Sequence, residues 1–231
     1  MANPTYYLTP NAAGTAFTGT GYTPDGTIPA GAIPCTQEQA QNFQAYVPSN
    51  GEIVSAPDSV LLQQTQSAQI ALVTQGYNTA TDYVPVTING TTYQVDNTAG
   101  KQALNLSLAI TANAMMQAPA WVASTEYAAG AYCNVGGVVL FCSTAGKSGT
   151  SAPTPPTAFG TPVTDGTAAW ELLGRKVYLQ GGSFVYMTPQ QITSAFQQGE
   201  LYLHQTSDKL ELLKAEIMAA TTVTAVQTFT F

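Results

Sequence analysis

The sequence predicts an α+β protein in which helices and β-hairpins form a scaffold that carries an inserted small all-β module. Asn89-Gly90 separates two β-rich runs, which is typical of a hairpin with a two-residue turn. The segments 98–117 and 192–217 carry apolar residues at helical spacing. Between them, residues 120–174 are rich in Gly, Ser, Thr and Pro and have no helical period, which indicates a separate β-module.

Residues 1–58 are expected to form a loop-rich attachment segment, because Gly, Pro, Thr and Asn dominate this region. Within it, Thr36 and Gln39 form a capping-box pattern. This pattern predicts a short helix that ends before Pro48. No basic stretch followed by an apolar stretch opens the chain, so we expect no signal peptide.

Residues 59–119 and 175–231 are expected to form one discontinuous scaffold domain. A helix from residue 59 to about residue 76 precedes the Asn89-Gly90 hairpin. The helix 98–117 carries two apolar stripes, which imply two packing partners. The first stripe contains Leu104, Leu108, Ala112 and Met115, and the second contains Leu106, Ile110 and Ala114. A second hairpin around residues 177–187 follows the module, and the tail 221–231 alternates like a short closing strand.

The last long helix begins at a second capping box, formed by Thr188 and Gln191, and carries a heptad register. Gly199 and Thr206 are the weak members of its apolar stripe. The large members, which we predict to mediate subunit or helix packing, are Ile192, Phe196, Leu203, Leu210, Leu213 and Ile217. The stripe could pack against the 98–117 helix or form a seam between chains, and the sequence leaves both open.

Charge is scarce throughout the chain. It has 13 acidic and 6 basic residues, or 8% charged, whereas soluble domains carry about 25%. A net charge of -7 without clustered Lys or Arg argues against a nucleic-acid partner. No window approaches 18 uninterrupted apolar residues, so we expect no membrane insertion. The uncharged polar surface suits a protein packed against other subunits.

The groups that most catalysis requires are also scarce, and we expect no enzymatic activity, cofactor or metal. His204 is the single histidine. The Gly-Lys-Ser at 146–148 lacks the first P-loop glycine and precedes prolines, which favours a simple turn. Asp165 and Glu171 are near each other in sequence, but a small β-module offers little room for a cleft between two catalytic carboxylates, so they are expected to be surface residues.

Three cysteines are too few for a disulfide framework. Gly136-Gly137 predicts a two-residue turn that sets Cys133 opposite Leu140 and Cys142 opposite Ala131. The two thiols would then be diagonal neighbours, and we expect them to be free.

The module resembles the small aromatic modules that are attached to chitinases and reused in phage tail-fibre proteins. The residues that carry this resemblance are Trp121, Tyr127 to Gly130, Phe141-Cys142, Ala145 to Gly149 with Pro153, and Asp165 to Trp170. The sugar-binding relatives stack exposed aromatic rings on pyranose rings, which makes Tyr127, Tyr132 and Trp170 the candidate glycan contacts here. Alternatively, these rings form only the core of the module, because so small a domain has few other large apolar groups.

The flanking segments are similar to an uncharacterised domain of tail-fibre and tail-fibre-assembly-like proteins. The residues that match are Tyr93, Gln94, Asp96, Trp121, Thr188 and the stretch 210–217. The resemblance implies a structural virion protein of a tailed phage, in the tail, baseplate or collar fibre apparatus, made in the host cytoplasm. Its partners would be other virion tail proteins, copies of itself and host-surface glycans. The alternatives are a tail-fibre assembly chaperone and a free carbohydrate-binding protein.

Overall fold

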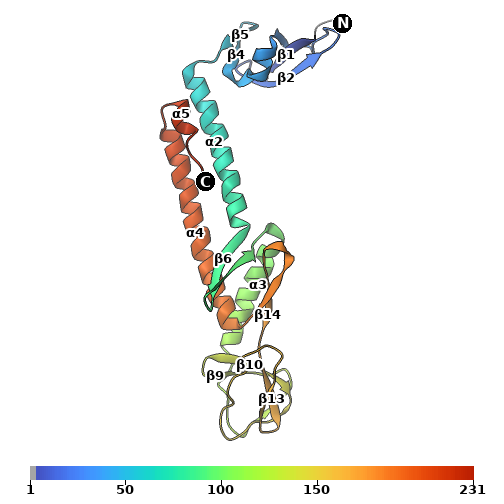
Figure 1. Ribbon diagram of the computed structural model, residues 1–231, viewed down its shortest axis with the longest axis vertical. Coiled ribbons are helices and arrows are strands. Elements are labelled where there is room, and N and C mark those ends of the chain that lie inside the picture. The colour runs from blue at the N-terminus through green and yellow to red at the C-terminus, as the bar shows by residue number, and fades with distance from the viewer. Residues whose placement is uncertain (1–3) are drawn as a thin grey trace. The chain divides into compact units, whose positions relative to one another are not determined.

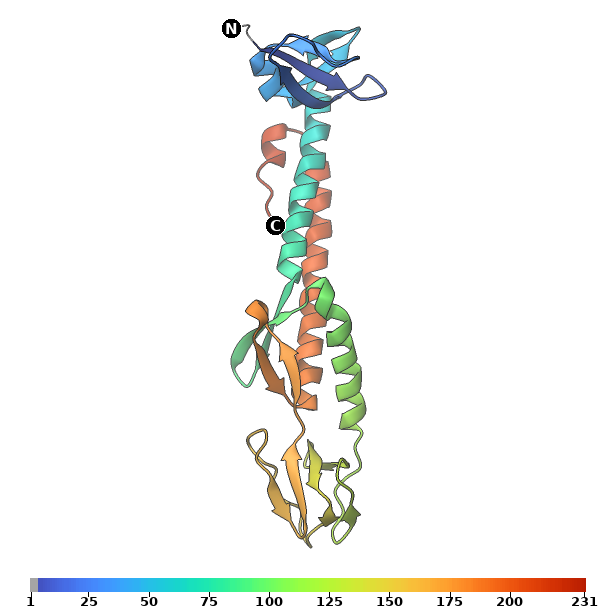
Figure 2. The same cartoon turned by 90° about the vertical axis from the view of Figure 1, so that its right-hand side faces the viewer.

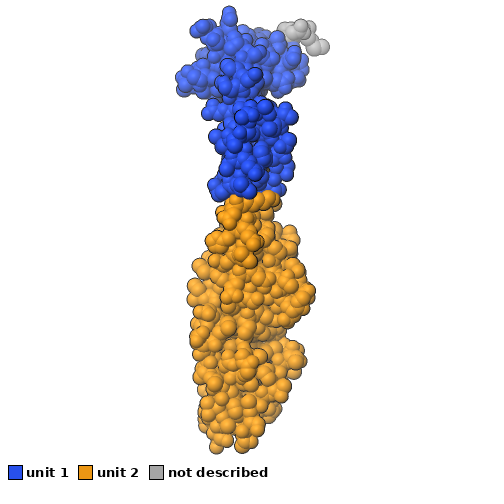
Figure 3. Space-filling view, turned by 90° about the vertical axis from the view of Figure 1, so that its left-hand side faces the viewer, with its two compact units in different colours: residues 1–74, 211–231 blue, residues 75–210 orange. Residues whose placement is uncertain are grey.

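The computed structural model describes residues 4–231 of the chain. Helices account for 39% and strands for 30%, with small antiparallel sheets, which confirms the α+β class. The chain forms two compact units, one of residues up to Thr74 with Glu211–Phe231 and one of Gln75–Leu210 (Figure 3). The boundary falls inside two long helices and not at residue 58. The discontinuous scaffold expected from the sequence is therefore divided between the units.

The N-terminal segment contains more regular structure than the loop-rich segment that was expected. Its strands are β1 (Thr5–Pro10), β2 (Phe17–Thr23), β3 (Ile33–Cys35), β4 (Tyr46–Ser49) and β5 (Glu52–Ser55). The first three form an antiparallel sheet in the order β2-β1-β3, and β4 pairs with β5. Leu8 and Phe17 are buried, whereas Thr9, Thr18 and Thr20 are exposed at alternate positions, so the short strands still have an apolar face.

The capping box at Thr36 is confirmed. Gln39 N–H donates to Thr36 Oγ1 at 3.1 Å, and Thr36 N–H donates to Gln39 Oε1 at 2.9 Å. The helix that it opens is short: α1 (Gln37–Gln41) is followed by the 3₁₀ turn η1 (Phe43–Ala45). It ends before Pro48, as the sequence predicts.

Two long helices, α2 (Asp58–Thr81) and α4 (Pro189–Ala219), lie side by side (Figures 1 and 2). In the first unit, the Gln66 side-chain amide donates to the carbonyl of Ile217 at 3.1 Å. In the second unit, the Tyr202 hydroxyl donates to the carbonyl of Ala80 at 3.0 Å. Thus α2 continues past the end near residue 76 that was expected.

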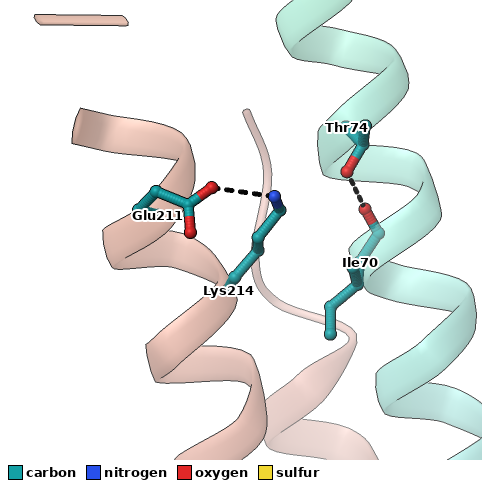
Figure 4. A network of polar contacts seen from close by, with 4 residues as sticks. All are labelled: Ile70, Thr74, Glu211 and Lys214. Atoms are coloured by element: carbon teal, nitrogen blue, oxygen red, sulfur yellow. Dashed lines mark hydrogen bonds and ion pairs between the residues drawn. The ribbon is translucent and has the colours of Figure 1, made fainter. Parts of the chain in front are cut away.

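Figure 4 shows two polar contacts on these helices in the first unit, one within each helix. Lys214 Nζ and Glu211 Oε1, 2.9 Å apart, form an i,i+3 ion pair on α4. On α2 beside it, the Thr74 hydroxyl donates to the Ile70 carbonyl of its own helix at 2.7 Å. Each of these polar groups is satisfied within one helix, so the pairing of the helices depends on other side chains.

The heptad stripe of α4 is the inner face of that helix. Its eight members are all buried or half-buried, whereas Leu201 and Leu212, on other faces of the helix, are 59% and 60% exposed. Ile192 and Leu203 pack in the core that also contains Ala112 of the 98–117 helix. That helix is therefore a partner of the first part of α4, and α2 lies beside the last part.

The core of the second unit contains two hairpins and a helix. These are β6 (Tyr83–Ile88) with β7 (Thr91–Asp96), α3 (Ala99–Met116), and β14 (Arg175–Tyr178) with β15 (Phe184–Met187). Asn89 and Gly90 have positive φ values of 51° and 78°, as a type I′ turn requires. α4 packs directly against β6 at Gly199, where an added Cβ would lie 3.4 Å from Val84 Cγ1. Both hairpins and both capping boxes predicted here are therefore found.

The two apolar stripes of α3 are covered to different extents. Leu108 and Ala112 of the first stripe pack in the core, and Leu104 near the start of the helix is 38% exposed. Leu106 and Ile110 of the second stripe are 51% and 63% exposed. Leu106 also lines a largely apolar cavity of about 410 Å³, together with Leu108, Phe196 and Leu203. The second packing partner that the sequence implies is therefore not supplied by the described part of the chain.

The inserted segment forms the expected all-β module. Its strands are β8 (Glu126–Tyr127), β9 (Tyr132–Val135), β10 (Val138–Thr144), β11 (Gly146–Lys147), β12 (Val163–Asp165) and β13 (Ala168–Leu172). Four of them form an antiparallel sheet in the order β12-β13-β10-β9, and β11 pairs with β8. Cys133 lies opposite Leu140, and Cys142 N–H donates to the Ala131 carbonyl at 2.9 Å, which confirms the predicted register.

The two ends of the insertion meet on neighbouring strands. Asn134 N–H donates to the Pro119 carbonyl at 2.8 Å, and Trp121 N–H donates to the Asn134 carbonyl at 2.9 Å. Leu173 N–H donates to the Val139 carbonyl, and Val139 is the direct strand partner of Asn134. The chain therefore enters and leaves the module at one place.

The tail does not form the closing strand that its alternation suggested. It contains the short helix α5 (Val223–Val226), because Thr222 Oγ1 accepts from Ala225 N–H at 3.2 Å and caps a helical turn. The Gln69 side chain then donates to the Phe229 carbonyl at 2.6 Å. Among the described residues, no helix combines the length and apolar character needed to span a membrane.

Candidate sites in the module and on the adjoining hairpin

A single carboxylate lies at the centre of the module. Trp121 Nε1–H and Trp170 Nε1–H both donate to Asp165 Oδ2, at 2.7 and 2.9 Å. The backbone N–H of Gly149 donates to Asp165 Oδ1 at 2.7 Å. Asp165 is only 5% exposed, so the expectation that it is a surface residue is wrong. Its oxygens are occupied by structural donors, which makes it unsuitable as one of a pair of catalytic carboxylates.

The glycine-rich segments of the module fit closely against each other. A Cβ at Gly146 would lie 2.4 Å from the Thr167 carbonyl oxygen, and a Cβ at Gly166 would lie 2.2 Å from the Lys147 carbonyl oxygen. Between them, Thr167 N–H donates to the Lys147 carbonyl at 2.8 Å. The Gly-Lys-Ser segment therefore packs directly against residues 166–167. It contains the strand β11 and is not the simple turn that the sequence predicts.

Ser148, the last residue of that tripeptide, is buried and has two partners. Its hydroxyl donates to the Val122 carbonyl at 2.8 Å and accepts from Thr125 N–H at 2.9 Å. A nucleophilic hydroxyl would need a neighbouring base and access to substrate. The Ser148 hydroxyl instead holds the start of the module to β11.

Of the three predicted glycan contacts, the structure contradicts Trp170. It is 0% exposed and packs with Cys133, Leu140 and Cys142, so its ring offers no face to a sugar. Tyr127 is half-buried, and its ring meets Trp170 edge to face at 4.8 Å between centroids. Its hydroxyl accepts from Val122 N–H at 2.8 Å. Tyr127 is therefore mainly a support for the core.

Tyr132 retains part of its surface. It is half-buried on β9, and its ring lies 6.0 Å from that of Phe141, its partner across the β9–β10 pair. The three candidates therefore do not share one exposed face, and Tyr132 alone keeps a position suited to a ligand.

Burial controls the cysteine chemistry of the module. It raises the pKa of the Cys133 thiol to about 12, with smaller contributions from the nearby Asp165 carboxylate and Cys142. Burial also raises the pKa of Cys142, although the backbone of Thr144 opposes the effect. Both residues are free cysteines. They act as small apolar core groups and not as nucleophiles.

A second candidate site lies on the outer side of the β14–β15 hairpin and was not anticipated from the sequence. Lys176 pairs across the hairpin with Tyr186, and Tyr178 pairs with Phe184. Because side chains alternate along a strand, these four residues lie on one side, while Val177 and Met187 lie on the other and are buried. We call the outer side, together with the adjoining Phe159 of the module, the aromatic face.

The rings of the aromatic face are close together and exposed. Phe159, Phe184 and Tyr186 are 37%, 47% and 44% exposed. The Tyr186 ring lies 5.8 Å from that of Phe159 and 5.7 Å from that of Phe184, at interplanar angles of 43° and 88°. The sequence contained one signal of this face, the alternation of Lys176 with Tyr178 and of Phe184 with Tyr186. It could not show which side of the hairpin would be buried.

Other sequence candidates are dispersed. His204 is exposed on α4. Within residues 4–231, no group of three or more His, Cys, Asp or Glu side chains is placed to hold a metal ion. Comparison with protein-family models, with curated proteins and with solved structures finds no match for this chain.

Proposed function

We propose that this chain is a structural protein of a tailed-phage virion. It assembles with further copies of itself and with other tail proteins, and it carries the β-module on a helical scaffold. The observation that supports assembly most directly is the uncovered second stripe of α3. Leu106 and Ile110 are 51% and 63% exposed, whereas Leu108 and Ala112 of the other stripe pack in the core. Exposed apolar stripes of this kind mark protein interfaces.

Further features support the same proposal. The cavity of about 410 Å³ beside Leu106 leaves room for apolar side chains of a partner. Only 8% of the residues are charged, so a partner surface would bury few ions. The resemblance of the module and its flanking segments to tail-fibre proteins supports the phage assignment. The closely engaged polar groups of the module argue against catalysis there, which fits a structural role.

Assembly can be tested on the purified chain by light scattering coupled to size-exclusion chromatography. We expect an oligomer, and we expect the double variant Leu106→Glu with Ile110→Glu to be smaller, because two charges would enter the interface. Asn78→Glu, at an exposed position of α2, is the matched control and should leave the mass unchanged. A wild-type monomer at high concentration would contradict assembly through α3.

The virion assignment needs a separate experiment. Mass spectrometry of purified particles of the encoding phage should find the chain in a fixed ratio to other tail proteins. Its presence in lysates but absence from particles would instead support an assembly chaperone.

A further inference from the structure

Two lysines of the second unit rest on aromatic rings. Lys101 Nζ lies 3.9 Å from the centre of the Tyr178 ring, and Lys176 Nζ lies 4.4 Å from that of Phe184. Among residues 4–231, neither ammonium group forms an ion pair with a carboxylate. The chain has 13 acidic residues, so carboxylates are not lacking. Two of its 6 basic residues are therefore held on rings of the aromatic face, and no carboxylate neutralises their charge.

The aromatic rings beside these lysines are also exposed to solvent. Three neighbouring aromatic side chains with more than a third of their surface exposed form an unusual apolar cluster for a protein surface. Their interplanar angles of 43° and 88° make a corner and not a flat platform. A corner can contact the C–H groups of a sugar ring from two sides, whereas a flat platform suits extended, planar chains.

The backbone holds this arrangement in place. The hairpin pairing fixes Lys176 beside Tyr186, and Phe159 reaches the same ring from the module. Phe159 fits there because Gly174 has no side chain: a Cβ at Gly174 would lie 2.7 Å from the Phe159 ring. The Gln190 side chain also donates to the Gly137 carbonyl, which joins α4 to the module. The rings are thus positioned before any ligand arrives.

We propose that the aromatic face binds an acidic saccharide, a chain of pyranose rings that carry carboxylate groups. Lys176 binds the sugar carboxylate, with Lys101 available to the next acidic unit, and Phe159, Phe184 and Tyr186 contact the C–H faces of the sugar rings. The observation that decides the ligand class is the pair of ammonium groups, Lys101 and Lys176, that have no carboxylate partner within residues 4–231. The site does not involve the α3 stripe, so it stands or fails independently of the proposed assembly.

Other ligands fit the face less well. A neutral saccharide would leave both ammonium groups unused. Single-stranded nucleic acid also combines rings with anions, but it presents one phosphate for every nucleotide to a chain with a net charge of -7. An acidic surface of a second copy would make the face a protein interface. These alternatives are outcomes that the experiment separates.

The full chain would be applied to a glycan array that carries oligomers of galacturonate, glucuronate, mannuronate and guluronate beside their neutral methyl esters. Affinities for the bound sugars would then be measured by titration calorimetry, with a dT oligonucleotide as a separate ligand. The variants are Lys176→Met, which removes the charge and keeps the apolar stem, and Tyr186→Ala. Lys147→Met, at an exposed lysine of β11 outside the face, is the charge-matched control.

We expect at least one uronate oligomer to bind, its methyl ester to bind at least about tenfold more weakly, and added salt to reduce the affinity. Lys176→Met and Tyr186→Ala should each weaken binding by at least about tenfold, and Lys147→Met should not. Absence of binding to every uronate oligomer would overturn the proposal. The proposal would also be overturned if the uronate oligomer and its methyl ester bound equally well, or if the chain preferred the dT oligonucleotide. A fall in oligomer mass caused by Lys176→Met would overturn it as well. A change of oligomer mass in the α3 variants alone would leave it standing.

Discussion

Trp121 and Trp170, 49 positions apart in the chain, donate their indole N–H groups to the same carboxylate oxygen of Asp165, at 2.7 and 2.9 Å. The chain has only two tryptophans, so its intrinsic tryptophan fluorescence reports on this contact. The module can therefore be followed inside the intact protein without a label.

Asp165→Asn is expected to destabilise the module. The amide can accept through one oxygen only, so at least one of the three donors, which are buried or part-buried, loses its partner, which costs about 1–3 kcal/mol for each unsatisfied group. Chemical denaturation followed by tryptophan fluorescence measures the change. Asp208→Asn, the same substitution at an exposed position of α4, serves as control and should leave the transition in place. A variant as stable as the wild type would show that the shared carboxylate is dispensable.

Two glycines of the module with similar backbone conformations should respond differently to alanine. Gly136 and Gly166 have φ values of 58° and 66°. A side chain at Gly136 meets nothing within 4 Å, so Gly136→Ala should cost only the conformational penalty of about 1–2 kcal/mol. At Gly166 the added Cβ would lie 2.2 Å from the Lys147 carbonyl oxygen, so Gly166→Ala must also separate the two segments. Thermal melts should rank Gly166→Ala well below Gly136→Ala, and equal melting temperatures would contradict the close contact.

The stability of the module should decrease at alkaline pH because of Cys133. Its pKa is about 12 in the folded chain and 9.0 when exposed. Between these values the unfolded chain loses the thiol proton and the folded chain keeps it, so the stability that is present below pH 9 is lost as pH approaches 12. The difference between wild-type and Cys133→Ala denaturation curves over this range isolates the thiol from tyrosines and lysines. Parallel curves would mean that the thiol ionises equally in both states.

The heptad stripe offers a matched pair of leucines on α4. Leu210 is 6% exposed and Leu212 is 60% exposed. Leu210→Ala should lower the free energy of unfolding by about 2–5 kcal/mol, because it leaves a cavity on the packed face. Leu212→Ala should change it by less than about 0.5 kcal/mol, and alanine preserves the helix in both variants. Circular dichroism during urea denaturation gives both values, and similar losses would show that the stripe is not the inner face.

Local signals in the sequence predict much of this fold. Asn89-Gly90 specifies its turn because both residues tolerate positive φ, and Thr188 with Gln191 specifies the start of α4 through hydrogen bonds three residues apart. Gly76, by contrast, does not end α2, since a glycine inside a helix weakens it without stopping it. Alternation in the tail indicated a strand, but the cap at Thr222 forms a helical turn instead.

The candidate sites depend on contacts between distant segments, and the sequence predicts them less well. Nothing near Asp165 in the chain indicates that Trp121, 44 residues earlier, donates to it. Trp170 was a reasonable glycan contact by residue type, and its burial follows from the strands that pack around it. The aromatic face needs both the hairpin and Phe159 of the module, which come together only in the folded chain.

The meeting of the two ends of the insertion, at the paired residues Asn134 and Val139, has a consequence for how such a chain can change over evolution. A segment whose ends lie together can be exchanged for another by recombination while the host fold needs only a short bridge between Pro119 and Gly174. The scaffold can then be retained while the sequence of the inserted module diversifies. Gain, loss or replacement of residues 120–174 would alter the module that the protein carries and leave its helices as they are.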